Sequence, residues 1–155
     1  MEEIHALPGH LIRRLHQISV AIFVEELQAA GFDLTPVQYA ALSTIQSNPS
    51  IDQATLAGLI AHDRTTISGV IDRLERRGLV ARSVSAKDRR ARVLELTPAG
   101  AATLSIARPV VRRAQDEMLR DLSPSERDAF MRMLKKVTTT ANDRARAPFR
   151  APEGD

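Results

Sequence analysis

Positive charge is concentrated in one short part of this chain, between residues 64 and 92. The basic side chains in it are Arg64, Arg73, Arg76, Arg77, Arg82, Lys87, Arg89, Arg90 and Arg92. Three acids oppose these nine bases, so the stretch carries a net charge of +6, while the whole 155-residue chain carries only +3. Because clustered guanidinium and ammonium groups neutralise phosphates, this focus of charge predicts a surface that binds a nucleic-acid backbone.

The first part of the basic stretch has the pattern of a helix that could enter the major groove of DNA. Asp63 is a suitable N-cap, and Gly78 is a suitable stop. Four apolar residues face the core at helical spacing, and these are Ile67, Val70, Ile71 and Leu74. Thr65 and Gly69 then point outward, and small side chains allow close approach to DNA. The expected DNA-binding residues of this helix are Arg64, Thr65, Thr66, Ser68, Arg73 and Arg76.

The second part of the stretch has the pattern of a β-hairpin with a basic tip. Residues 79–84 and 91–96 are predicted strands, and the loop between them is the wing of a winged helix-turn-helix. Its expected DNA-binding residues are Lys87, Arg89 and Arg90. Either arginine could enter a narrow minor groove, where the negative potential is enhanced. We expect Asp88, the one acid in this tip, to orient a neighbouring arginine.

Two short helices joined by a tight turn are predicted around the start of this stretch. A capping box from Thr35 to Gln38 opens a preceding helix that ends near Ser47. A very short strand is expected at residues 50–51, and Asp52 then caps a helix that continues to about residue 60. A turn at residues 61–62 leads into the basic helix, and this spacing matches a helix-turn-helix.

Longer amphipathic helices flank this lobe. The first runs from about Pro8 to Ala30 and spans roughly 34 Å. Another is expected over residues 98–121, where Pro109 should kink it, and a capping box at Ser123 opens the last helix. These helices offer more apolar surface than one winged-helix lobe can cover, so we expect a dimer.

The predicted fold is mainly α with a small β-hairpin wing. It consists of a winged helix-turn-helix lobe, residues 35–97, and a helical dimerisation region, residues 1–34 and 98–143. Residues 144–155 contain Ala, Arg, Pro and Gly without periodicity, so we expect a disordered tail.

The composition excludes several classes of protein. No cysteine is present, which rules out disulfides, thiol chemistry and a cysteine-based zinc finger. The four histidines have no metal-ligand spacing, and neither a phosphate loop nor a hydrolase motif occurs, so we expect no metal, no cofactor and no enzymatic activity. No apolar run is long enough for a membrane span and no signal peptide opens the chain, which predicts a cytoplasmic protein.

Residues 8–142 resemble the MarR (multiple antibiotic resistance regulator) family of winged-helix repressors. The segments that carry the resemblance are TPVQY at 35–39, DRTTI at 63–67, RLERRGLV at 73–80, DRRA at 88–91 and LELTPAG at 94–100. The family's wing pattern of Asp, any residue and Arg falls on Asp88 and Arg90. The resemblance implies a homodimer held by its first and last helices. It also implies a palindromic double-stranded operator and a small ligand that weakens DNA binding.

The family places its ligand between the dimerisation helices and the DNA-binding lobe. Here His10, Arg14 and Gln17 flank the apolar stripe of the first helix, and Tyr39 is the only tyrosine. Because His10 and Arg14 are four residues apart, both could meet one anion. These four residues suggest a small aromatic or heteroaromatic acid. The segment 10–18 is also similar to repressors of nicotinate catabolism in this family, which implies a hydroxylated pyridine carboxylate.

Several alternatives stay open at this point. The basic residues of the first helix could be solvated, or could pair with Glu25, Glu26 or a partner chain, in place of binding an effector. The chain could also be a ligand-independent or architectural DNA-binding protein, which would bind without sequence preference. A protein-interaction module is a third alternative, and it would have no affinity for DNA at moderate salt.

Overall fold

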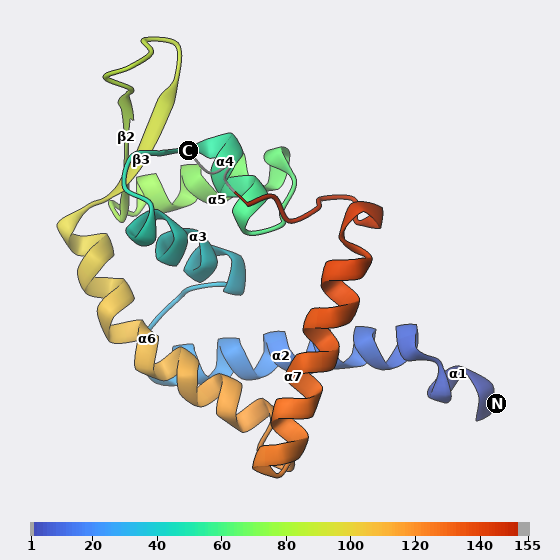
Figure 1. The fold of residues 1–155 in the computed structure, drawn as a ribbon. Helices are drawn as coiled ribbons and strands as arrows, with labels where there is room; N and C mark the ends of the chain where they lie inside the picture. Colours follow the sequence, from blue (N-terminus) through green and yellow to red (C-terminus); the bar gives the residue numbers. More distant parts are fainter. Residues whose placement is uncertain (1, 152–155) are drawn as a thin grey trace.

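Helices form most of the molecule, and a small antiparallel sheet lies among them (Figure 1). The structure is a computed structural model that describes residues 2–151. Its helices are α1 (Glu2–Ala6), α2 (Pro8–Ala29), α3 (Pro36–Ser47), α4 (Gln53–Leu59), α5 (Arg64–Arg76), α6 (Pro98–Met118), α7 (Pro124–Thr140) and the 3-10 helix η1 (Asn142–Arg144). Its strands are β1 (Ile51–Asp52), β2 (Val80–Val84) and β3 (Arg92–Leu96). The predicted mainly α fold with a β-hairpin wing is confirmed.

Helices α3 and α7 begin at the predicted capping boxes, and the predicted glycine follows α5. Thr35 Oγ1 accepts a hydrogen bond from the Gln38 N–H (3.2 Å), and Gln38 Oε1 accepts one from the Thr35 N–H (3.1 Å), which completes the first capping box. Ser123 forms the second box with Glu126. Gly78 has a φ of +71° just after α5. Glycine reaches this conformation without steric cost, so the chain can turn there into the hairpin.

The sheet has the strand order β1–β3–β2. β2 and β3 pair antiparallel, from Val80 opposite Leu96 to Val84 opposite Arg92. β1 pairs along the other edge of β3, with Ile51 opposite Leu94. The sequence predicts this strand at residues 50–51. The structure places it one residue later, because residue 50 lies in a turn with a φ of +63°.

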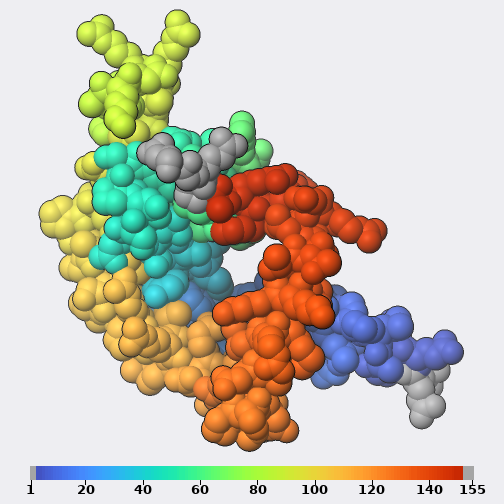
Figure 2. All heavy atoms as spheres, viewed as in Figure 1, coloured from blue at the N-terminus to red at the C-terminus, as the bar shows by residue number. Residues whose placement is uncertain are grey.

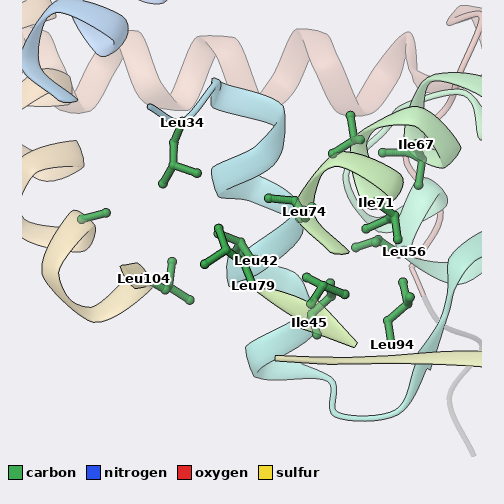
Figure 3. Packing of buried hydrophobic residues seen from close by; sticks show 14 of the residues in the cluster. Leu34, Leu42, Ile45, Leu56, Ile67, Ile71, Leu74, Leu79, Leu94 and Leu104 are labelled. Carbon is green, nitrogen blue, oxygen red and sulfur yellow. The ribbon is translucent and has the colours of Figure 1, made fainter. Parts of the chain in front are cut away.

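One hydrophobic core joins the helices of the lobe to the sheet (Figure 3). Leu42 and Ile45 of α3, Leu56 of α4 and Leu94 of β3 are each at most 1% exposed. The predicted inward residues of α5 are buried, and these are Ile67, Val70, Ile71 and Leu74. Full burial of such a side chain contributes about 1.5–3 kcal/mol. α5 is therefore anchored by one face, and its opposite face lies at the surface.

The start of α6 is locked to the lobe. The Thr97 hydroxyl donates to the Gly78 carbonyl oxygen (2.6 Å) and accepts from the Gly100 N–H (3.0 Å). A Cβ on Gly100 would overlap the Leu79 carbonyl oxygen, so only glycine fits at this contact. The junction fixes the direction in which α6 leaves the lobe.

α6 packs along α2, and α7 then turns away from both of them (Figure 1). Phe23 and Leu27 of α2 are buried, together with Leu104 and Ala107 of α6. By contrast, α7 has no buried residue. Within residues 2–151, no helix combines the length and the apolar character needed to cross a bilayer.

The C-terminal end of α6 differs from the predicted end near residue 121. The helix ends at Met118, and the Arg127 guanidinium of α7 donates to the Leu119 carbonyl oxygen (3.1 Å) and to Asp116 Oδ1 (2.9 Å). Helix ends leave carbonyl groups without internal partners, and this arginine satisfies one near the end of α6. The predicted kink site, Pro109, lies inside α6.

The C-terminal segment differs from the predicted disordered tail. Asn142 Nδ2 donates to the Phe149 carbonyl oxygen (3.0 Å), and Asn142 Oδ1 accepts from the Phe149 N–H (2.8 Å). The Arg150 N–H donates to the Gly58 carbonyl oxygen of α4 (2.9 Å). Residues 145–151 therefore lie against the lobe, because partners distant in sequence satisfy their backbone groups. Residues 152–155 of the predicted tail lie outside the described residues.

Candidate DNA interface

The start of α5 is held by Asp63. Asp63 Oδ1 accepts from the Thr66 N–H (2.8 Å), and Asp63 Oδ2 accepts from the Thr66 hydroxyl (2.8 Å). These bonds lower the pKa of the Asp63 carboxyl below its usual value of 3.8, and the charge of Arg146 lowers it further. The Thr66 hydroxyl proton is donated to the cap, so a contact of this side chain with DNA, which stays a prediction, would use the hydroxyl oxygen as an acceptor.

The exposed face of α5 carries most of its predicted DNA-binding residues. Thr65, Arg73 and Arg76 are exposed, and Ser68 is half-buried. A Cβ built on Gly69 would meet nothing closer than Arg73 Nη2, at 4.0 Å. Open space therefore lies over Gly69 beside the Arg73 guanidinium, which would allow a DNA groove to approach the helix closely.

The two acids of α5 are paired with β2. Arg82 Nη2 lies 2.6 Å from Asp72 Oδ1, and Arg82 Nη1 lies 2.9 Å from Glu75 Oε2. The side chain of Arg82 is 24% exposed. The pairing neutralises two carboxylates on the surface where phosphates would approach. It also ties the helix to the hairpin.

The tip of the wing is shaped by hydrogen bonds to its backbone. Ser85 Oγ accepts from the Lys87 N–H (3.2 Å), and Asp88 Oδ1 accepts from the Arg90 N–H (2.9 Å). Asp88 was expected to orient a neighbouring arginine, and its bond goes to the backbone of Arg90 rather than to a guanidinium. The side chains of Lys87, Arg89 and Arg90 are exposed, at the end of a hairpin that projects from the lobe (Figure 1).

The cations of this surface are available to an external anion. Within residues 2–151, no ion pair involves Arg64, Arg73, Arg76, Lys87, Arg89 or Arg90. Unpaired arginines on a helix and on an adjacent wing are what phosphate neutralisation along a duplex needs. No group of three or more metal-ligating side chains is found in the same residues.

In the single chain, the expected effector residues have separate contacts. The His10 ring packs edge-on against His5, with centroids 5.3 Å apart, and Gln17 Oε1 accepts from Arg13 Nη1 (2.9 Å). Arg14 is exposed. Tyr39 packs edge-on against Phe23 of the core, at 6.1 Å. Tyr39 lies apart from the three α2 residues because the N-terminal half of α2 extends away from the lobe (Figure 1).

Comparison with known proteins decides the family. The MarR family model matches residues 34–91. The HTH-type transcriptional repressor NicR of Pseudomonas putida is 36% identical to this chain over 129 residues, which cover 83% of the chain and 80% of NicR. The chain belongs to the MarR family.

Solved structures of MarR-family regulators have the same fold. BpsR of Bordetella bronchiseptica, whose DNA binding is regulated by 6-hydroxynicotinic acid, aligns with a TM-score of 0.81 and 32% identity over 86% of this chain and 94% of BpsR. The repressor CouR, bound to a 23-mer DNA duplex, aligns with a TM-score of 0.82 and 32% identity over 89% of this chain and 96% of CouR. This MarR-family chain is thus a DNA-binding transcriptional regulator, and its named relatives are not enzymes.

Two further cations of this MarR-family chain lie beside the lobe, and sequence reasoning missed them. Arg146 and Arg150 border a surface cleft together with residues of α4 and α5. The sequence places both in the predicted tail, where no periodicity indicates a contact. The one local feature that could have indicated this contact is Asn142, which precedes a basic, proline-containing segment.

Proposed function

We propose that this regulator is a homodimeric repressor that binds a palindromic operator and leaves it when a small heteroaromatic acid binds. The acid that we favour is a hydroxylated nicotinate. The observation that carries the proposal is the set of exposed cations on α5 and on the wing, which form no ion pair within residues 2–151. Exposed arginines and lysines of this kind neutralise the phosphates that flank a half-site.

Uncovered apolar surface supports the homodimer. Leu11 and Ile18 of α2 and Met133 and Val137 of α7 are between 47% and 60% exposed. Large apolar side chains exposed along these two helices are what a covering partner chain would bury. We therefore assign residues 1–34 and 98–143 to dimerisation and residues 35–97 to DNA binding.

A two-fold dimer accounts for a palindromic operator. One lobe reads one half-site, so two copies of α5 would lie about 34–36 Å apart, or a multiple of this, on one side of the duplex. An isologous dimer presents the same surface twice, and the two half-sites then carry the same sequence in opposite directions. The likeness to CouR, a repressor solved on a 23-mer DNA duplex, supports binding of the lobe to double-stranded DNA.

The relatives support a nicotinate-like effector. NicR and BpsR are both similar to most of this chain, and 6-hydroxynicotinic acid regulates the DNA binding of BpsR. On α2, His10 and Arg14 are one turn apart, which suits a carboxylate. The partner's helices would cover this half of α2 and provide the burial that a single chain lacks.

A gel shift and a footprint on the DNA that flanks the gene test this proposal. We expect a discrete two-fold footprint, a steep loss of affinity with salt and release by 6-hydroxynicotinate but not by benzamide, a neutral aromatic control. A footprint without release would contradict the effector and favour a ligand-independent regulator. Weak, sequence-independent coverage would favour an architectural protein instead.

A further inference from the structure

The segment after η1 crosses from the end of α7 to the DNA-binding lobe (Figures 1 and 2). We call residues 145–151 the C-terminal arm. Its path is fixed at two points, by the paired hydrogen bonds between Asn142 and Phe149 and by the bond from Arg150 to the Gly58 carbonyl of α4. Arg150 Cβ would lie 3.0 Å from a Cβ at Gly58. The absence of a side chain at residue 58 therefore lets the arm approach α4 closely.

The arm brings positive charge to the start of α5. A cleft of about 550 Å³ opens between the arm and the helix-turn-helix, and its polar lining includes Thr55, His62, Asp63, Arg64, Arg146 and Arg150. Asp63 is committed to capping α5, and Arg150 lies 3.4 Å from Asp143. Among residues 2–151, the cleft lining holds three arginines and one aspartate, and Asp143 pairs with one of these arginines, so the charge beside the cleft is net positive.

The positive charge of the arm lies where the phosphates of bound DNA would run. In a helix-turn-helix the second helix lies in the major groove. The phosphate backbone of the duplex therefore runs close to the turn and to the N-terminal ends of the two helices. Arg64 is the first residue of α5, and Arg146 lines the same cleft. The arm is thus placed beside the N-terminal end of the recognition helix, where the helix dipole also favours an anion.

We propose that the C-terminal arm is a second phosphate-binding element of this regulator, in which Arg146 and Arg150 contact the duplex backbone beside the half-site read by α5. The proposal rests on the DNA-binding role of the lobe. Phosphate contacts carry no sequence information, so the arm would add affinity and register without changing which operator is preferred.

The double variant Arg146→Gln/Arg150→Gln tests the arm through the salt dependence of binding. The probe is a mixed-sequence duplex of about three helical turns (~30 bp), which does not require knowledge of the operator. The affinity falls with salt, and each lost phosphate contact makes the slope of log affinity against log salt less steep by ~0.9. We therefore expect the double variant to have a slope that is less steep by about 1.8 for each protomer. The affinity for an operator and for an unrelated duplex should fall by the same factor.

The matched control is Arg112→Gln/Arg120→Gln, which removes the same charge from the exposed Arg112 of α6 and from the exposed Arg120 just after the end of α6. If the arm variant has the same salt slope as the control, the proposal is overturned, and the arm only connects α7 to the lobe. Tighter binding would also overturn it, because it would mean that the arm obstructs DNA. The repressor proposal fails in a different way. In that case the parent protein gives no discrete footprint but still binds the mixed-sequence duplex.

Discussion

Arg82 of β2 and Asp72 of α5 form an ion pair of 2.6 Å that joins the wing to the recognition helix. The same guanidinium also reaches Glu75, one turn further along α5. The hairpin and the helix bear separate parts of the DNA-binding surface, and this arginine adds a polar link between them beside their shared hydrophobic core. It also masks two negative charges that phosphates would otherwise meet.

Replacement of Arg82 should therefore weaken DNA binding more than it weakens folding. We expect Arg82→Met to lower stability by only about 0.2–1 kcal/mol for each pair lost, as for other surface pairs. The loss of DNA affinity should be larger than this loss of stability, and it should be largest at low salt. The reason is that Asp72 and Glu75, without their partner, repel the duplex. Urea unfolding and fluorescence anisotropy measure the two effects. Arg120→Met, which breaks the exposed pair with Glu117, should leave DNA affinity unchanged.

Arg73 of α5 and Arg90 of the wing should each contribute directly to the DNA complex. We expect Arg73→Ala and Arg90→Ala to cost about 1–3 kcal/mol of binding free energy if the guanidinium contacts a base edge. Loss of a phosphate contact alone would lower the salt slope by about 1. Light scattering should show that the dimer persists. Unchanged affinity in both variants would remove these residues from the interface.

Arg14 should act in the response to the effector and not in DNA binding. We expect Arg14→Gln to bind an operator like the parent protein but to need a higher concentration of 6-hydroxynicotinate for release, because a carboxylate loses its guanidinium partner. Anisotropy titrations at several effector concentrations measure the shift. Arg112→Gln, an exposed change on α6, is the control. A normal response in the Arg14 variant would disprove its role.

Gly100 should be intolerant of any side chain. A Cβ there overlaps the Leu79 carbonyl oxygen, so Gly100→Ala must shift the junction between β3 and α6, at a cost of about 1–3 kcal/mol, typical of overpacking. Gly9→Ala in α2 has nothing within 4 Å of the new Cβ and should be neutral or stabilising. Thermal unfolding distinguishes the two, and equal stabilities would contradict this account of the junction.

Acid should weaken the start of α5 through Asp63. Its pKa is lower in the folded chain than in the unfolded chain, because the Thr66 N–H and hydroxyl stabilise the carboxylate. The resulting stability is present above the unfolded pKa and is lost as the pH falls through the folded pKa. Asp63→Asn keeps an oxygen acceptor for the cap but cannot titrate. The parent should therefore lose its stability advantage over this variant as the pH falls below about 4, as urea midpoints would show. A constant difference would contradict the assignment.

Much of the lobe follows from local signals in the sequence. The capping residues Thr35, Asp63 and Ser123 act within three residues along the chain, so the helix starts can be predicted without a fold. The buried face of α5 follows from its 3.6-residue period. The basic hairpin was likewise predictable, because its strands, its loop and its charges are adjacent in the chain.

Only the tertiary structure decides which distant groups meet. Composition predicts a disordered tail after residue 143, yet Asn142 and the carbonyl of Gly58 give the arm a defined path. The pairing of Arg82 with two α5 acids depends on how the hairpin packs, and the distance from Tyr39 to the start of α2 depends on where α2 leaves the core. Helix caps and periodicity arise from neighbours in sequence, whereas these contacts arise from packing between segments, which no local pattern encodes.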